Sequence, residues 1–285
     1  MASRIEELLN AAIDGGKIDF EPRSRAEKYL KAVVNKSGTE GLPTPISRID
    51  ALYFKLAETA PLSYEAGKQS AYDEFWDTYQ KNGERTSYQG AFQNAFWNED
   101  TFKPKYDMNV TGDCQYMFRA SAMNIDLVEY LEKLGVTLSF SGKKSSDFMY
   151  TFSSTNFTRI GVVDVSGVKN VNQCFFYSSY LETIDEVIIA ETVNPTEYMF
   201  QYCSALKNIK FTGTIGKSIY FSQSPLTVDS MKSVISALKN YAGTDNELKY
   251  TVKFKANCWT ALEASGAAPD GNTWKEYVAN LGWNT

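Results

Sequence analysis

Histidine is absent from the 285 residues of this sequence. Without histidine, neither a Ser-His-Asp triad nor a Cys-His dyad can form, and the common His-containing zinc and non-haem iron sites are excluded. Carboxylate pairs such as Glu74/Asp77 and Glu182/Glu186 leave glycosidase chemistry open. Such pairs usually lie on solvated surfaces. We therefore predict a protein that is not an enzyme, with no catalytic residue, no metal site and no cofactor.

Cysteine is scarce, and the four cysteines form no Cys-x-x-Cys pair. A zinc ribbon or a thioredoxin-like site is therefore not expected. Free, buried thiols in a reducing compartment are the simpler expectation, and assembly in a host cytoplasm is consistent with them. The cysteines are Cys114, Cys174, Cys203 and Cys258.

Long runs of one residue class are also missing. The net charge is −5 and no basic stripe is present, so we expect no nucleic-acid partner. No apolar stretch approaches the roughly 18 residues that span a bilayer, so we expect no membrane partner. Polar residues begin within the first six positions, Met1–Glu6, and no apolar secretory signal segment follows. This pattern disfavours an exported host adhesin.

Aromatic residues are abundant, at 14%, with 18 Tyr and 17 Phe. Tyrosine gives rigid contact area with a polar tip, which suits recognition surfaces. Packing inside a thin repeat core is the alternative use, and we favour it for most of these rings.

One short phrase occurs three times near the start, at offsets of 21 and 23 residues: Ser3–Glu6, Ser24–Glu27 and Ser47–Asp50. Its serine can cap a helix while the acid three residues later reaches back, which is a capping box. Apolar residues follow at helical spacing. Helices of about a dozen residues are marginal alone, so their apolar stripes need a partner, either each other or a larger assembly. The predicted assembly or anchor residues are Ile5, Leu8, Leu9, Tyr29, Leu30, Val33, Ile49, Leu52 and Tyr53.

A second repeat occupies the middle of the chain. The pattern Phe-x-x-x-Ser-x-Leu-x-x-Ile at Phe175–Ile184 recurs position for position at Phe200–Ile209, 25 residues later. Less regular copies occur at Tyr150–Ile160 and Phe118–Ile125. Such a unit cannot bury its own core, whereas stacked copies can.

These residues, and Met199–Ile209 above all, resemble the BspA-like (Treponema-type) leucine-rich repeats. The resemblance covers residues 112–225. It implies a solenoid of short strands with irregular loops that acts in adhesion or protein binding without a catalytic site.

A second resemblance concerns the N-terminal third. The Ser-Arg-x-Glu phrases, together with Tyr72–Trp76 and Phe102–Tyr106, are similar to the N-terminal parts of phage and prophage proteins of gut Firmicutes. This resemblance implies a tether that holds a fibre, decoration or tail-associated protein on the particle.

The last segment predicts a cap for the repeats. A helix is expected over 229–241, a strand over 248–254, and two short helices follow. Three tryptophans stand here, Trp259, Trp274 and Trp283. They can form a sugar-binding platform or pack in the core, and we favour packing.

Together these features predict an α+β protein: a short N-terminal helical repeat segment, then a short irregular leucine-rich-repeat solenoid with an α/β C-terminal cap. The expected divisions are a helical anchor at 1–60, an aromatic helix and connector at 61–111, the repeats at 112–225 and the cap at 226–285.

We expect the chain to be a phage virion structural protein. Its N-terminal helices would anchor it on other virion proteins, and its repeats would bind a host-surface glycan or protein. A homo-oligomer, with a trimer as the working guess, would suit the N-terminal helices. A bacterial surface adhesin of the same repeat class and a carbohydrate-active enzyme are the alternatives. The candidate ligand contacts are Tyr116, Tyr150, Tyr177, Tyr180 and Tyr202.

Overall fold

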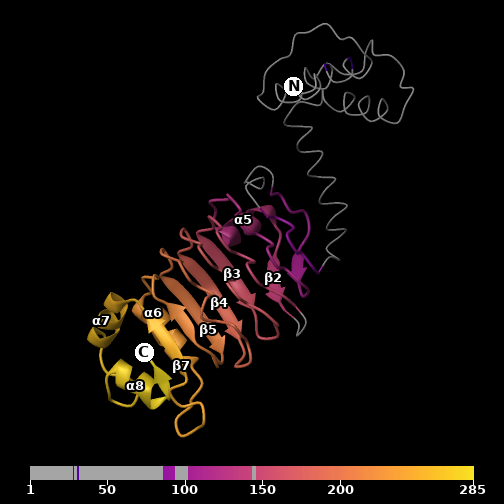
Figure 1. Ribbon diagram of the computed structural model, residues 1–285. Helices are drawn as coiled ribbons and strands as arrows, with labels where there is room; N and C mark the ends of the chain where they lie inside the picture. Colours follow the sequence, from indigo (N-terminus) through magenta and orange to yellow (C-terminus); the bar gives the residue numbers. More distant parts are fainter. Residues whose placement is uncertain (1–27, 29–30, 32–85, 94–101, 143–145) are drawn as a thin grey trace, which may run out of the picture. The chain divides into compact units, whose positions relative to one another are not determined.

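The computed structural model describes residues 28, 31, 86–93, 102–142 and 146–285 (Figure 1). From residue 86 onward these residues belong to one unit, which spans Trp76–Thr285. The nine predicted anchor residues between Ile5 and Tyr53 lie outside the described residues, as does the part of the expected aromatic helix and connector at 61–85. The assembly role of that segment therefore stays a prediction.

Five short strands form the larger sheet, and their order in the sheet follows their order in the sequence. Every neighbouring pair is parallel. In β5, Ile209 and Phe211 are buried while the residues between and beside them are exposed, so one face of the strand packs on the core. The strands are β1 (Met108–Val110), β2 (Leu138–Ser141), β3 (Arg159–Asp164), β4 (Thr183–Ile189) and β5 (Asn208–Gly213).

A second parallel sheet follows, formed by β6 (Ile219–Phe221), β7 (Tyr250–Phe254) and β8 (Trp283–Asn284). Parallel neighbours need a crossover, which is usually a helix. Among the described residues, three crossovers contain helices: α5 (Leu127–Leu134) joins β1 to β2, α6 (Val228–Ser236) joins β6 to β7, and α7 (Ala256–Ala264) with α8 (Trp274–Asn280) joins β7 to β8.

The predicted α+β class was wrong. The described part of the chain is an α/β fold, with parallel sheets of five and three strands and the helices α5–α8. It shows no leucine-rich-repeat solenoid at 112–225. The sequence interpretation gave 112–225 and 226–285 different architectures, whereas parallel strand pairing occurs in both. A repeat interval sets the spacing of strands along the chain but not the connections between them.

A continuous row of stacked, buried phenylalanine rings runs through the core, and we call it the phenylalanine ladder. Phe175 and Phe200, which are 25 residues apart, stack with ring centres 5.2 Å apart and planes 7° apart. Ile184 and Ile209, also 25 apart, are register partners in β4 and β5. Residues that recur in the sequence are thus neighbours in space. The ladder consists of Phe92, Phe118, Phe152, Phe175, Phe200, Phe221 and Phe254.

Candidate functional site: the turn face

Four turns of six residues each are stacked beside the larger sheet: 115–120, 149–154, 172–177 and 197–202. Backbone N–H groups of each turn donate to carbonyls of the next. Tyr116 donates to Met149 at 3.1 Å, for example, and Tyr177 donates to Gln201 at 2.9 Å. These bonds form a second ladder that fixes the turns relative to one another. We call the solvent-facing side of the four turns the turn face.

Several residues of the turn face have a left-handed backbone. Two occur in each of the first three turns, four residues apart, and one occurs in the fourth. Non-glycine residues rarely adopt this conformation, which costs roughly 1–2 kcal/mol each and persists only where the surrounding structure holds it. The bonds between turns supply that restraint. The left-handed residues are Tyr116 with Ala120, Tyr150 with Ser154, Gln173 with Tyr177, and Tyr202.

The structure places four of the five predicted tyrosines at these left-handed positions, in two separate pairs. The rings of Tyr116 and Tyr150 stack with centres 5.4 Å apart and planes 10° apart, and both are half-buried. The ring centres of Tyr177 and Tyr202 are 5.1 Å apart, and their side chains are 55% and 41% exposed. Tyr180, 55% exposed, lies three residues after the end of the third turn.

Two members of this surface were missed in the sequence analysis. Tyr198, in the fourth turn, is 46% exposed. Its sequence signal was weak but present, because it stands 25 residues after Gln173 of the preceding turn. Arg119, in the first turn, lies 5.3 Å from the ring centres of both Tyr116 and Tyr150. No sequence pattern pairs Arg119 with Tyr150, because they come from different turns.

Exposed tyrosine is concentrated here. Among the described residues, seven large hydrophobic side chains are exposed, and four of them are tyrosines within or next to the last two turns. Scattered exposed apolar residues are ordinary, whereas adjacent ones indicate an interaction surface, and Tyr177 and Tyr202 are in mutual contact. We call these four residues the tyrosine patch: Tyr177, Tyr180, Tyr198 and Tyr202.

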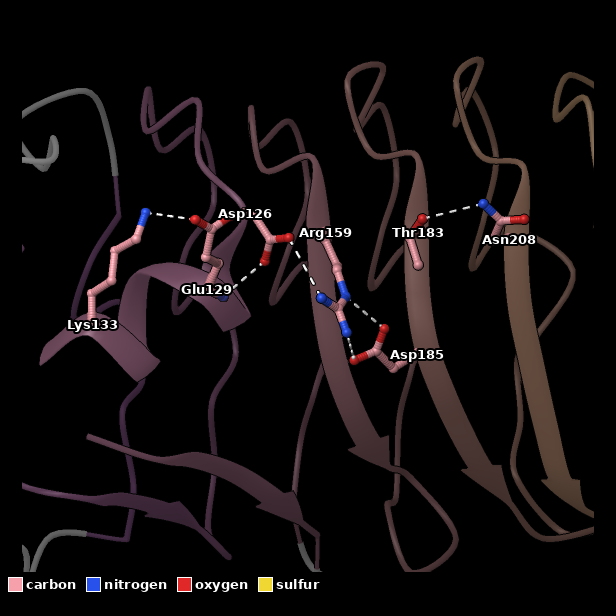
Figure 2. A network of polar contacts seen from close by, with 7 residues as sticks. All are labelled: Asp126, Glu129, Lys133, Arg159, Thr183, Asp185 and Asn208. Atoms are coloured by element: carbon pink, nitrogen blue, oxygen red, sulfur yellow. Dashed lines mark hydrogen bonds and ion pairs between the residues drawn. The ribbon is translucent and has the colours of Figure 1, made fainter. Parts of the chain in front are cut away.

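The outer face of the strands carries a polar network (Figure 2). Arg159 on β3 donates to both carboxylate oxygens of Asp185 on β4, at 2.7 and 2.9 Å, and lies 3.6 Å from Asp126 at the start of α5. The hydrogen bond to Asp185 raises the pKa of Arg159. These charges satisfy one another, and exposed ion pairs contribute little net stability. The network thus links β3 to β4 and to the start of α5 through charges that are already paired.

Beside this network, a hollow of about 310 Å³ lies between α5 and strands β2 and β3. Its lining is mainly apolar, and the carboxylates that reach it are those of Glu132 and Asp185. Asp185 already accepts both hydrogen bonds from Arg159. The hollow therefore offers no pair of free, facing carboxylates of the kind that glycoside hydrolysis needs.

The acid pairs named from the sequence do not form a catalytic pair where they are described. Glu182 pairs with Lys207 at 3.2 Å and Glu186 pairs with Lys210 at 3.0 Å. Hydrogen bonds from Thr212 and Lys210 lower the pKa of Glu186, whereas a general acid needs a raised pKa. Glu74 and Asp77 lie outside the described residues.

All four cysteines are free and buried. Burial raises the pKa of Cys174 well above its ordinary value and raises the pKa of Cys203 to about 12. Nucleophilic cysteines have a lowered pKa instead. Because these thiols stay protonated at neutral pH, they serve packing.

The three C-terminal tryptophans are also packed. Trp259, Trp274 and Trp283 are 7%, 6% and 0% exposed, so they do not form an open sugar platform. Within the described ranges, no group of three or more Cys, Asp or Glu side chains is placed to hold a metal ion. In the same part of the chain, no helix is long and apolar enough to cross a membrane.

The turn face is therefore the surface on which the structure gathers most of the predicted contact residues. No protein family model, curated protein or solved structure matches this chain, so the arrangement of its own residues carries the functional inference.

Proposed function

We propose that this chain is a non-enzymatic structural protein of a bacteriophage particle, of the fibre, decoration or tail-associated kind, and that its turn face contacts a glycan or protein of the host surface. The observation that carries the binding role is the tyrosine patch. Its rings stand on turns whose backbone is fixed by hydrogen bonds from one turn to the next.

The physical properties of the patch favour recognition. Tyrosine has few rotatable bonds, so little side-chain entropy is lost when a ligand immobilises it. A turn that is already ordered loses little more, because a ligand does not have to fold it. Tyr177 and Tyr202, which are in mutual contact, present adjacent aromatic surface and two hydroxyl groups to solvent.

The place on a phage particle rests on the N-terminal phrases. Those phrases suit an anchor on other virion proteins, and short amphipathic helices gain most by packing on further copies. Assembly in the host cytoplasm is consistent with four free, buried cysteines. Mass spectrometry of particles purified from an induced host that carries the gene tests this part, and absence of the chain from those particles contradicts it.

The binding role is tested on the full chain, by measuring its attachment to intact cells of the host strain and to their purified surface glycans. We expect Tyr177→Ala/Tyr202→Ala to bind at least tenfold more weakly, because central aromatic contacts commonly contribute more than about 1 kcal/mol each. Leu248→Ala is the matched control, since Leu248 is 53% exposed and also has a left-handed backbone. If the double variant binds as well as Leu248→Ala, the turn face is not the contact surface.

A further inference from the structure

Arg119 is held in an unusual position on the turn face. Its guanidinium carbon lies 5.3 Å from the ring centre of Tyr116 and 5.3 Å from that of Tyr150. The two rings are nearly parallel, with centres 5.4 Å apart. The guanidinium carbon is therefore equidistant from the two ring centres and within cation–π distance of each. These contacts restrict the side chain and so reduce the entropy that it would lose on binding a ligand.

The charge of Arg119 has no acidic partner within the described residues. None of the ion pairs among them includes Arg119, and the residue is exposed. Arg159 offers a contrast, because both carboxylate oxygens of Asp185 accept hydrogen bonds from it. Arg119 is thus exposed, lies against two aromatic rings and has no carboxylate partner among the described residues, so its guanidinium can receive an anion.

Small residues lie between Arg119 and the tyrosine patch. Ala120 and Ser154 are both exposed and occupy matching left-handed positions of the first two turns, and Tyr177 occupies that position in the third. Hydrogen bonds connect these positions in sequence, Ala120 to Ser153 at 2.9 Å and Ser154 to Phe176 at 2.7 Å. Two such steps span about 10 Å at the usual strand spacing. One row of the turn face therefore begins with the small exposed side chains of Ala120 and Ser154 and continues with Tyr177 and Tyr202, while Arg119 lies against Tyr116 and Tyr150 of the first two turns.

We propose that the turn face binds an acidic sugar chain, a proposal that rests on the binding role proposed above. Arg119 receives a carboxylate or sulfate of one sugar through its planar donor fork. Tyr177 and Tyr202 stack on the apolar C–H faces of neighbouring sugars, and the small, exposed side chains of Ala120 and Ser154 leave room for the sugar chain.

A sugar suits this face better than an acidic peptide does. Extended peptides commonly bind by adding a strand to an exposed sheet edge, where unpaired N–H and C=O groups meet them. On the turn face the N–H groups of Tyr116, Tyr150 and Tyr177 are already used between turns. The groups left for recognition are the aromatic rings and one cation. The rings match the C–H faces of a sugar, and the cation matches its acid group.

The test is a titration of the full chain with two matched pairs of probes. Trigalacturonic acid is compared with its methyl ester, and lactose 3′-sulfate is compared with lactose. We expect one anionic probe to bind at least tenfold more tightly than its neutral counterpart, with a preference that weakens as salt is added. The better of the two anions identifies a carboxylated or a sulfated ligand. Equal binding of both members in each pair, or no binding of any probe at millimolar concentration, overturns the proposal.

Substitutions locate the site. Arg119→Gln should lower the affinity for the anionic probe about tenfold or more and leave the affinity for its neutral counterpart within a factor of two, because a charge-assisted hydrogen bond is lost. Arg119→Lys keeps the charge but loses the fork, so an intermediate loss is expected. Lys249→Gln is the control: it also removes an exposed cation that lies over a tyrosine ring, 5.7 Å from the centre of Tyr250. Unchanged thermal unfolding of each variant excludes a folding defect.

The outcomes separate this proposal from the broader one. If Arg119→Gln has no effect while Tyr177→Ala/Tyr202→Ala still abolishes attachment to cells, the acidic-sugar inference fails and the binding role stands. If hexaglutamate binds in an Arg119-dependent way while the sugars do not, an acidic protein is the partner and the sugar proposal is wrong.

Discussion

Phe175 and Tyr177 are two residues apart in one turn, yet the first ring is fully buried and the second is 55% exposed. The same division recurs in the next turn, at Phe200 and Tyr202. Phenylalanine has no polar atom and can be stacked without a hydrogen-bonding partner, whereas the tyrosine hydroxyl needs one and finds it in water. The aromatic residues of these turns thus divide into a buried stack and an exposed surface, and the exposed surface is where we propose that a ligand binds.

The phenylalanine ladder makes a clear prediction for Phe175, which stacks on Phe152 and on Phe200 at 5.2 Å each. Phe175→Ala removes both contacts and leaves a cavity, so the free energy of unfolding should fall by about 3–5 kcal/mol. Chemical denaturation of the full chain measures this loss. Tyr180→Ala, at an exposed site, should change the same quantity by less than about 0.5 kcal/mol. Equal effects of the two substitutions would contradict the packing role of the ladder.

At the scale of elements, the ends of β4 and β5 are paired, and their backbones lie very close together at Ile189 and Gly213. Gly213, the last residue of β5, has a φ of +96°, and a Cβ added there would lie 2.0 Å from the carbonyl oxygen of Ile189. That same oxygen accepts a hydrogen bond from the N–H of Thr214 at 3.0 Å. A side chain at 213 would therefore collide with the acceptor that closes this end of the sheet.

Gly213→Ala should accordingly destabilise the fold by about 3 kcal/mol or more, from backbone strain together with the disturbed hydrogen bond. Gly243→Ala separates these two effects, because Gly243 also has a positive φ, +70°, but nothing lies within 4 Å of an added Cβ. We expect it to cost only the conformational strain, about 1–2 kcal/mol. Thermal or chemical unfolding of both variants measures the difference, and an equal loss at the two sites would show that the close approach is unimportant.

Individual elements were more predictable than their assembly. The helix expected at 229–241 is observed at Val228–Ser236, and the strand expected at 248–254 is observed at Tyr250–Phe254. Their apolar periodicities are local and readable. Parallel pairing and the placement of crossover helices depend on contacts between distant segments, and for that reason the fold class was mispredicted.

The candidate site could be predicted only in part for the same reason. The tyrosines were recognisable as aromatic residues beside a repeated core phenylalanine. Their left-handed backbone had no sequence signal, because glycine or asparagine usually marks such positions. The contact between Arg119 and Tyr150 joins residues 31 apart in the sequence, across two turns, and no local pattern reports it.

At the scale of the whole molecule, the phenylalanine ladder crosses from the larger sheet to the smaller one. Phe200 stacks on Phe221 of β6 at 4.9 Å, and Phe221 stacks on Phe254 of β7 at 6.0 Å. The phenylalanine ladder therefore packs against both sheets, and both sheets belong to the single unit Trp76–Thr285. The repeated capping-box phrases of residues 1–60 lie in the sequence outside this unit, and they are the segment that we expect to serve assembly.

Self-assembly through residues 1–60 is open to direct measurement. We expect light scattering to give the mass of a trimer or larger oligomer for the full chain and of a monomer for a truncation that lacks residues 1–60, because apolar stripes on short helices are stabilised chiefly by packing. The full chain carrying Leu9→Asp, Leu30→Asp and Leu52→Asp should also become monomeric, since a charge on each predicted stripe opposes its burial. Serine-to-alanine changes at Ser37 and Ser70, away from the phrases, provide the control. If the full chain is itself a monomer, these stripes do not bring copies together, and anchoring on a foreign virion protein becomes the remaining role for them.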